Sequence, residues 1–580
     1  MLEPWFVQGA VDGRLRDRTV SVLARAVGWT VVAVICAAYL FYFANLRAFP
    51  LQDFPNHIAR AVVISDLLFD HGVRYGQTYS LALLPIPYVL HDLILAGLVK
   101  LFGVQAGSAI FCAFVLVSLP AALMFYLRAT RLAPRAALFV FMVGLYLATD
   151  WFFLMAFMGF RLALAILVVS LALAEILRRQ WSRAVFCAYA AVLVAGYLTH
   201  LTTLVFFTIA LGVSTPLRLW FRATSVRREL YLWLPVAALL VAHFGFPAAP
   251  QSATNPATYE YFWGSWHAKL QHLPFEFIRF GSSYEQPLLL LFIACLLWPL
   301  RRSLQRRRLL QLRVLEPLLI AAAFAGFYFI LPESYTDSSF VDVRALTVVA
   351  IMALLASLNM PEPQSRGRSF EALPVLGLAF LLAVANFAYL MRHVGKAEAS
   401  ITQYRDLGKA IPEGSYVLPI HTIPKDGTIR PLLHAGAYLV ADRNAVIPYL
   451  FSGDRGDPMK YFRYRERPYT PDEDWYRARL SWDKATEQTF EAGGRIYSWR
   501  FQYSTRDKTW APEEFVPVDW SRVACRYDFL LMTLPVDVKL IGVPTRPVLA
   551  NETAALVAVD KSACRSNLSV KRTVRLPTEH

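Results

Sequence analysis

Long apolar blocks separated by short basic clusters dominate the chain from residue 27 to residue 391. A transmembrane helix needs about 20 predominantly apolar residues, and many of these blocks approach that length. The pattern predicts a polytopic α-helical membrane protein with about 11 crossings. The predicted crossings cover residues 27–43, 107–127, 136–150, 160–177, 184–199, 201–216, 230–247, 287–300, 314–332, 344–360 and 371–391. The division at His200 is open, because residues 184–213 can also form one long tilted helix.

The basic clusters lie between the apolar blocks and predict an orientation. Examples are Arg178 with Arg179 and Arg227 with Arg228. Because cytoplasmic loops carry the excess of Lys and Arg, residues 1–25 are expected in the cytoplasm and, after an odd number of crossings, the carboxyl end outside. The net charge of +16 follows from this topology and does not indicate a nucleic-acid partner. No A-x-A-like cleavage site follows the basic segment, so the first span is expected to remain as an anchor.

Two stretches of the first outward loop, residues 49–106, are not expected to cross the bilayer. Residues 58–70 mix apolar and charged side chains as an amphipathic interfacial helix does. Residues 81–102 are long enough to cross, but two prolines, Asp92 and Lys100 interrupt them. Counting this stretch as a crossing would place several later arginines outside, so we predict an interfacial or re-entrant segment.

Composition supports the membrane assignment and separates a terminal domain. The chain of 580 residues is 56% hydrophobic with a mean hydropathy of +0.41, too apolar for a soluble protein of this size. After the membrane domain, residues 26–391, no further span follows, and residues 392–580 predict a soluble α/β domain outside. A disulfide between Cys525 and Cys564 suits an oxidising compartment. The expected helix covers 401–411, and the expected strands cover 416–420, 445–447, 527–532, 538–542 and 555–559.

The segment from Pro50 to Val62 places three ionisable side chains at the mouth of the first membrane helix. If Pro55 opens a helix, Asp53 and His57 lie about one turn apart and point the same way. This spacing suits a catalytic carboxylate with a neighbouring imidazole, and Arg60 adds a guanidinium. The simpler alternatives are that Asp53 only caps the helix and that His57 is a polar residue of an interfacial helix.

Other candidate residues lie near the outward ends of later spans. Charge in or beside a membrane is costly and often marks function, although side chains at helix ends can reach water. Arg161 can instead form a structural bridge with Asp150, His200 can serve helix packing, and Arg344 can fix a loop by pairing with Asp342. The aromatic residues can stack on a sugar or anchor the chain at the interface. The candidates are Asp150, Arg161, His200, Asp342 and Arg344, with Trp263 and Trp266.

The organisation of nearly the whole chain resembles the membrane-embedded GT-C glycosyltransferases. The shared features are an acidic residue opening the first outward loop, a second acid at the next outward turn, many spans and a terminal domain outside. In that pattern Asp53 and Asp150 correspond to the two acids, and Arg344 to a basic residue that holds donor phosphate. The stretch from Met158 to Arg161 also resembles bacterial envelope proteins of this kind.

The resemblance implies an inverting glycosyltransferase of the bacterial inner membrane that uses a polyprenyl-phosphate-linked sugar. The acceptor would be an envelope glycan, lipid or protein. Chemistry points the same way, because transfer to a hydroxyl needs a base and positive charge near the departing phosphate. Asp53 is the candidate base, with His57 orienting it or acting as the base itself, while Arg344, Arg161 and Arg60 are candidate phosphate ligands.

Three matters remain open at this stage. A divalent metal, Mg²⁺ or Mn²⁺, would be held by Asp53 and Asp150, but the first loop lacks the adjacent acidic pair of the family pattern. A transporter or flippase for a lipid-linked saccharide is a competing function, although internal repeats are not evident. A non-catalytic scaffold of a polysaccharide assembly is the third. The sequence has no P-loop lysine, GxGxxG, HExxH, CxxC or GxSxG motif.

Overall fold

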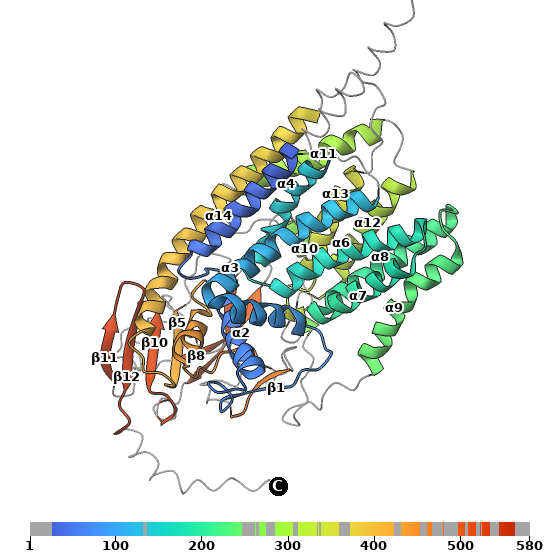
Figure 1. The fold of residues 1–580 in the computed structure, drawn as a ribbon. Helices are drawn as coiled ribbons and strands as arrows, with labels where there is room; N and C mark the ends of the chain where they lie inside the picture. The colour runs from blue at the N-terminus through green and yellow to red at the C-terminus, as the bar shows by residue number, and fades with distance from the viewer. Residues whose placement is uncertain are drawn as a thin grey trace, which may run out of the picture.

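The computed structural model describes residues 26–130, 136–245, 261–262, 266–273, 285–305, 311–332, 334–335, 338–358, 372–422, 431–452, 461–466, 479–480, 497–504, 509–517, 523, 525–533 and 545–562. Within these ranges a bundle of apolar helices carries a region of short strands at one end (Figure 1). This arrangement confirms the predicted fold class, a polytopic helical membrane protein with a terminal α/β region.

A helix lies at every predicted crossing. Six helices of the described residues are long and apolar enough to span a membrane, and four shorter apolar helices accompany them. The chain does break at His200, whose backbone is extended and whose Nδ1 accepts from the Thr202 amide at the start of the next helix. The helices at the predicted crossings are Ala26–Asn45, α3 (Val89–Ala129), α4 (Ala136–Ala148), α6 (Met158–Arg179), α7 (Arg183–Thr199), α8 (Leu201–Trp220), α9 (Val226–Gly245), α11 (Glu285–Gln305), α12 (Leu312–Ile330), α13 (Val343–Leu358) and α14 (Ala372–Gly408). Of these, α9 belongs to neither the six long nor the four shorter apolar helices.

The first outward loop forms α2 (Phe54–Phe69), β1 (Tyr79–Leu81) and the beginning of α3. Proline at the start of α2 supports the predicted helix opening. Gly103 interrupts α3 with φ 79° and ψ 168°, a backbone conformation that favours glycine. The predicted re-entrant stretch 81–102 is therefore largely the first arm of α3, which meets the membrane-spanning arm at this glycine.

Close packing of the two arms of α3 depends on a second glycine. A Cβ at Gly107 would lie 2.7 Å from the backbone carbonyl carbon of Leu98, whereas a Cβ at Gly97 meets nothing within 4 Å. We expect Gly107→Ala to destabilise the protein by about 1–3 kcal/mol, because backbone must move. Gly97→Ala, in the same helix, should be neutral or slightly stabilising. Thermal unfolding of the two variants checks this, and equal melting temperatures would contradict it.

Ion pairs gather at the end of the bundle where α6 and α8 finish and where α9 and α12 begin. Arg178 binds Glu229 through Nε at 2.8 Å, and Arg218 binds Glu316 through Nε at 2.7 Å. The other end of α6 starts at Met158, so a helix of 22 residues separates this cluster from the outward turn at Asp150. Arg178 and its partner Glu229 therefore lie at the opposite end of α6 from Asp150.

The C-terminal region forms a mixed five-stranded sheet in the order β11-β12-β10-β5-β7. Strand β5 (Val417–Thr422) runs parallel to β10 (Phe529–Thr533) and to β7 (Arg479–Leu480), and β12 (Ala554–Val559) is antiparallel to β10 and to β11 (Thr545–Ala550). Three predicted strands correspond to β5, β10 and β12, and 445–447 contributes an isolated bridge. The expected strand 538–542 lies outside the described residues. Strands β8 (Tyr497–Ser504) and β9 (Thr509–Pro517) form an antiparallel pair.

The structure also bears on the helix and the disulfide that were predicted for this region. The expected helix 401–411 is not separate, because α14 continues from the last crossing to Gly408. The apolar residues of the crossing and the polar residues after it belong to one uninterrupted helix. The change in composition at residue 392 led to the prediction of two separate helices. Cys525 is disulfide-bonded, and Cys564 lies outside the described residues. Cys36, Cys112, Cys187 and Cys295 are free.

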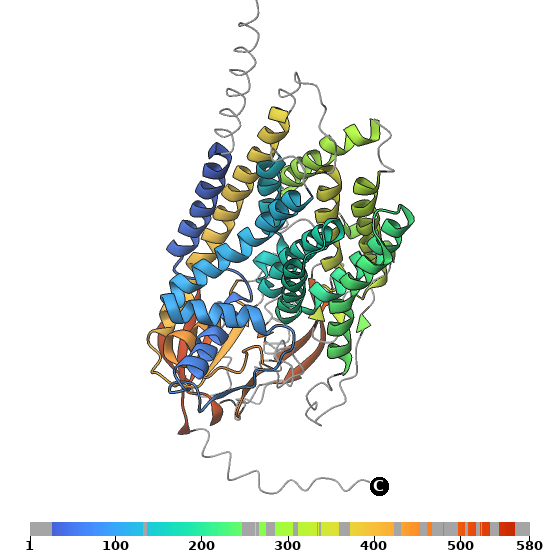
Figure 2. The same cartoon turned by 45° about the vertical axis from the view of Figure 1, so that its right-hand side comes forward.

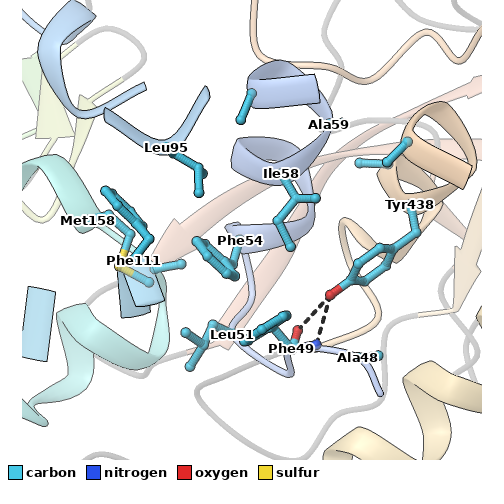
Figure 3. Close-up of a cluster of buried hydrophobic side chains, with 14 of the residues drawn as sticks. Ala48, Phe49, Leu51, Phe54, Ile58, Ala59, Leu95, Phe111, Met158 and Tyr438 are labelled. Atoms are coloured by element: carbon cyan, nitrogen blue, oxygen red, sulfur yellow. Dashed lines mark hydrogen bonds between the residues drawn. The ribbon is translucent and has the colours of Figure 1, made fainter. Parts of the chain in front are cut away.

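The C-terminal region packs directly on the first outward loop, as Figures 1 and 2 show from two directions. Strand β1 pairs antiparallel with β6 (Phe462–Tyr464). The Tyr438 hydroxyl, from α15 (Tyr438–Arg443), accepts from the Phe49 amide at 2.8 Å (Figure 3). Figure 3 shows Phe54 and Ile58 of α2 in the same apolar cluster. The start of α2 is therefore held between the bundle and the C-terminal region.

Candidate active site

The outward turn from Asp150 to Arg161 joins α4 to α6 and contains the short helix α5 (Trp151–Leu154). Asp150 caps α5, its Oδ1 accepting from the Phe153 amide at 3.0 Å. Its Oδ2 accepts from Arg161 NH1 at 2.6 Å, and Arg161 NH2 donates to the Leu147 carbonyl at 2.8 Å. These contacts favour the structural role for this pair: Arg161 fixes the turn by binding both its carboxylate and its backbone.

Asp53 lies against the other end of the same short helix. The Gln52 amide donates to the Leu154 carbonyl at 3.0 Å, and the Asp53 amide donates to the Met155 carbonyl at 3.2 Å. Although Asp53 occupies the N-cap position of α2, its side chain makes no capping hydrogen bond. Its Oδ1 instead lies 3.4 Å from Nε2 of His434 in the C-terminal region. Capping therefore does not account for this carboxylate.

The environment of Asp53 suits a base that works near neutral pH. Burial raises the pKa of Asp53 to about 7, against the opposing effects of the Gln52 amide and the Arg60 charge. The residue is only 8% exposed. A carboxylate with a pKa near 7 is a stronger base than an ordinary one and is still ionised in a large fraction of molecules at that pH.

His57 and Arg60 join a buried network around Asp92 of α3. Arg60 NH2 lies 2.6 Å from Asp92 Oδ2 and 3.0 Å from His57 Nδ1, and the Tyr461 hydroxyl donates to the same carboxylate. Burial lowers the pKa of His57, which agrees with a neutral ring whose Nδ1 accepts from Arg60. Both side chains of the Arg60–Asp92 pair are fully buried. Arg60 is thus bound within the protein, which argues against the predicted phosphate contact.

Among the described residues, one group of three side chains could hold a metal ion. Ligand atoms of His57, His91 and Asp92 lie within 4.8 Å of one another. Two imidazoles favour zinc or a similar transition metal over Mg²⁺ or Mn²⁺. Arg60 contacts two of these three residues, and its positive charge would oppose a second cation there.

Aromatic rings of the same turn support Arg344 of α13. Its guanidinium carbon lies 5.4 Å from the centroid of the Phe157 ring and 5.5 Å from that of Phe160. The His200 ring lies beside the same Phe160 ring, with centroids 5.9 Å apart. Its centroid is 4.5 Å from that of the Tyr88 ring in the first loop. The Arg344 guanidinium is thus held beside two aromatic rings where α6 begins. Arg344 and His200 therefore adjoin the turn that also binds Asp53.

The remaining candidates have other surroundings. Asp342 binds Lys269 of α10 (Trp266–His272) at 2.9 Å and accepts from the Val343 amide at 2.8 Å, which indicates a role in fixing this loop. Trp266 is 69% exposed and stacks edge-on with His267. Trp263 lies outside the described residues. Nearby, β2 (Tyr261–Phe262) pairs with β3 (Ser334–Tyr335), which pairs with β4 (Ser338–Ser339).

Sequence reasoning missed several residues of this site. Asp92 was noticed only as an interruption of an apolar stretch, and His434 and Tyr461 were not singled out. Asp92 binds Arg60 of α2, His434 lies beside Asp53, and Tyr461 donates to Asp92. His434 and Tyr461 are more than 350 positions away from α2 in the sequence. One local signal existed: Asp92 follows His91 in an otherwise apolar helix, which is costly unless the charge is paired. For His434 and Tyr461 the sequence carries no local signal.

Comparison with known proteins establishes the fold. No family model and no curated protein sequence matches the chain. Two solved structures of ArnT from Cupriavidus metallidurans, one in the apo state and one bound to undecaprenyl phosphate, match with a TM-score of 0.52 and 14% identity, over 93% of this chain and 99% of that one. ArnT is a GT-C glycosyltransferase. This chain has the GT-C fold. The predicted fold family is thereby confirmed.

Proposed function

We propose that this protein is a membrane glycosyltransferase that moves a sugar from a polyprenyl-phosphate donor to a hydroxyl of an envelope glycan, lipid or protein. The observation that carries the proposal is the buried carboxylate of Asp53, which is held by α2, the turn at 150–161 and His434. The shared fold supports it, because ArnT has been solved with undecaprenyl phosphate bound.

The reaction assigns a role to each charged group. The acceptor oxygen attacks C1 of the sugar, and its proton passes to the Asp53 carboxylate. The bond between C1 and the phosphate oxygen breaks, and the electron pair leaves with the phosphate. Arg344 donates hydrogen bonds to the phosphate and offsets its charge. A single displacement of this kind inverts the configuration at C1.

Arg344 is the arginine candidate whose replacement we expect to weaken donor binding. We expect Arg344→Leu to raise the KM for the donor about 10- to 100-fold, because hydrogen bonds to a charged group contribute about 1.5–3 kcal/mol. Arg344→Lys should restore part of this loss by keeping the charge. Arg74→Gln, a half-exposed arginine of the first outward loop, is the control and should leave KM unchanged. An unchanged KM in Arg344→Leu would remove this residue from donor binding.

The rate should depend on pH through the ionisation of Asp53. Since Asp53 acts as a base only when ionised, and burial raises its pKa to about 7, the rate should rise with pH and reach half its limit near pH 7. The measurement is kcat/KM across pH 5–9 with a donor whose phosphate keeps one charge over that range. A rate already at its plateau at pH 5 would show that Asp53 has an ordinary pKa or is not the base.

The test of the function is donor consumption by purified protein in lipid vesicles. A panel of polyprenyl-phosphate sugars is offered with candidate envelope acceptors, and release of polyprenyl phosphate is measured. The proposal predicts release that requires an acceptor hydroxyl. Movement of intact donor between leaflets without release would favour the flippase instead. We place the protein in a bacterial inner membrane with the site and the C-terminal region outside the cytoplasm, which is where such acceptors lie.

No observation establishes a metal requirement, and a divalent ion at this site stays a proposal. If His57, His91 and Asp92 bind zinc, Arg60 must move away from His57. If Mg²⁺ or Mn²⁺ binds Asp53 and Asp150, His434 and Arg161 must release them. Donor consumption with and without a chelator separates metal-dependent from metal-independent transfer.

A further inference from the structure

His434, from the C-terminal region, lies beside the Asp53 carboxylate. It precedes η3 (Ala435–Ala437), is 5% exposed, and places Nε2 3.4 Å from Asp53 Oδ1. At this distance one N–H of the ring can bind the carboxylate with a small adjustment. The contact joins two parts of the chain that are separated by 381 positions, from residue 53 to residue 434.

The imidazole is held in place on several sides. Phe451 packs on the His434 ring with centroids 5.1 Å apart, and the same phenyl ring lies 5.7 Å from the Arg60 guanidinium. The Phe451 amide donates to Asn56 Oδ1 at 3.1 Å, one turn along α2 from Asp53. The Phe451 ring that packs on His434 is therefore itself fixed to α2, which limits the freedom of the histidine to leave the carboxylate.

We propose that His434 is the positioning residue of Asp53: its Nε2–H donates to Oδ1, favours the ionised form of the carboxylate over the protonated form, and directs Oδ2 toward the acceptor hydroxyl. The catalytic consequence of this inference rests on the proposed function. The effect of His434 on the ionisation of Asp53 is independent of that function. Arg60, two turns along α2, also acts on this carboxylate through its charge, and Arg60 is bound in turn to His57 and to Asp92 of α3. Gln52 contributes an amide donor.

The proposal has a consequence for ionisation that a purely structural role lacks. Burial raises the pKa of Asp53 to about 7, so the native protein holds this proton when the unfolded chain has already lost it. Stability therefore falls as pH rises from about 4 to 7. Removing the His434 donor disfavours the carboxylate further, which extends this fall to higher pH.

The experiment compares two substitutions in the full-length protein. His434→Gln keeps an N–H near the position of Nε2, and His434→Leu removes it. His71→Leu, an exposed histidine at the end of α2, is the matched control. Melting temperature and initial transfer rates are measured from pH 5 to pH 9 in each protein and, for the leucine variant, also in an Asp53→Asn background.

We expect His434→Leu to lower kcat about 10- to 100-fold with KM changed less than about threefold. The acidic limb of its pH–rate profile should shift to higher pH by about half to one pH unit. The melting temperature of the same variant should continue to fall up to a higher pH than that of the wild type. His434→Gln should restore the limb and most of kcat. In Asp53→Asn, adding His434→Leu should change neither rate nor pH dependence further, because the two residues act as a unit.

The outcomes separate this inference from the proposed function. If wild-type protein transfers sugar and His434→Leu keeps its kcat and its acidic limb, His434 does not position Asp53. If wild-type protein consumes no donor, the proposed function fails, and the melting curves decide the inference alone. Identical pH dependence of melting in the wild type and His434→Leu would overturn it. Equal loss of rate in the leucine and glutamine variants, with unchanged pH limbs, would show a packing role instead.

Discussion

Asp92→Asn is expected to destabilise the folded protein by about 3–5 kcal/mol, because it removes the negative partner of a buried guanidinium. Arg60 and Asp92 are both fully buried and lie 2.6 Å apart, with the Tyr461 hydroxyl on the same carboxylate. An unpaired charge in such a place cannot reach water. The expected result is a large fall in melting temperature and in the yield of folded protein. The loss should also loosen the C-terminal region, which contacts this network through Tyr461.

The chain provides a control for this prediction in the same two elements. Asp70, at the end of α2, pairs with Lys100 of the first arm of α3, but both side chains are more than 40% exposed. We expect Asp70→Asn to change stability by less than about 1 kcal/mol, because solvent screens exposed pairs. A double change of Arg60→Met with Asp92→Leu should recover much of the lost stability, since no charge stays unpaired. An Asp92→Asn protein that melts with the wild type would contradict the buried pair.

The helical bundle could be predicted from the sequence because its signal is local. Each predicted crossing is a run of apolar residues whose length the bilayer sets, and basic clusters separate many of these runs. The break at His200 was one of the two alternatives that the sequence left open, the other being a single long helix. The continuation of α14 to Gly408 was not predicted, because the polar second half of that helix has the composition of a soluble domain.

The candidate site could be predicted only in part. Asp53, His57 and Arg60 lie within one helical segment, where spacing alone shows that they share a region. Their partners come from elsewhere: Arg60 binds Asp92 of α3, and Asp53 lies beside His434 of the C-terminal region. Tyr461, from the same region, donates to Asp92. The spacing of Asp53 and Asp150 in the sequence does not reveal how the two residues are related in the fold. The two residues adjoin opposite ends of one short helix, α5.

The placement of charge bears on the competing transporter. A transporter of lipid-linked saccharide is expected to carry polar residues near the middle of the membrane. Here the ionisable candidates gather around the outward turn at 150–161, while the other large charged cluster, with Arg178 and Glu229, lies at the far end of α6. Two separate clusters at opposite ends suit an enzyme on one face of the membrane better than a path across it.

Asp53→Asn is expected to have the largest effect on activity. Without a base for the acceptor proton, kcat should fall about 100- to 10,000-fold, while the KM for the donor changes little. The same change should stabilise the protein above pH 7, because ionising this buried carboxylate costs free energy that asparagine does not incur. A loss of activity combined with a gain in stability cannot arise from misfolding. Asp66→Asn, in the same helix but bound to the Arg74 and Tyr75 amides, is the matched control.

The central claim is that the Asp53 carboxylate, held between α2, the 150–161 turn and His434, removes the acceptor proton in sugar transfer. The most direct test is the single-turnover rate of polyprenyl phosphate release at pH 8, with equal amounts of folded wild-type and Asp53→Asn protein. The account predicts acceptor-dependent release by the wild type and a rate at least about 100-fold lower in the variant. Release at the wild-type rate in Asp53→Asn would contradict it.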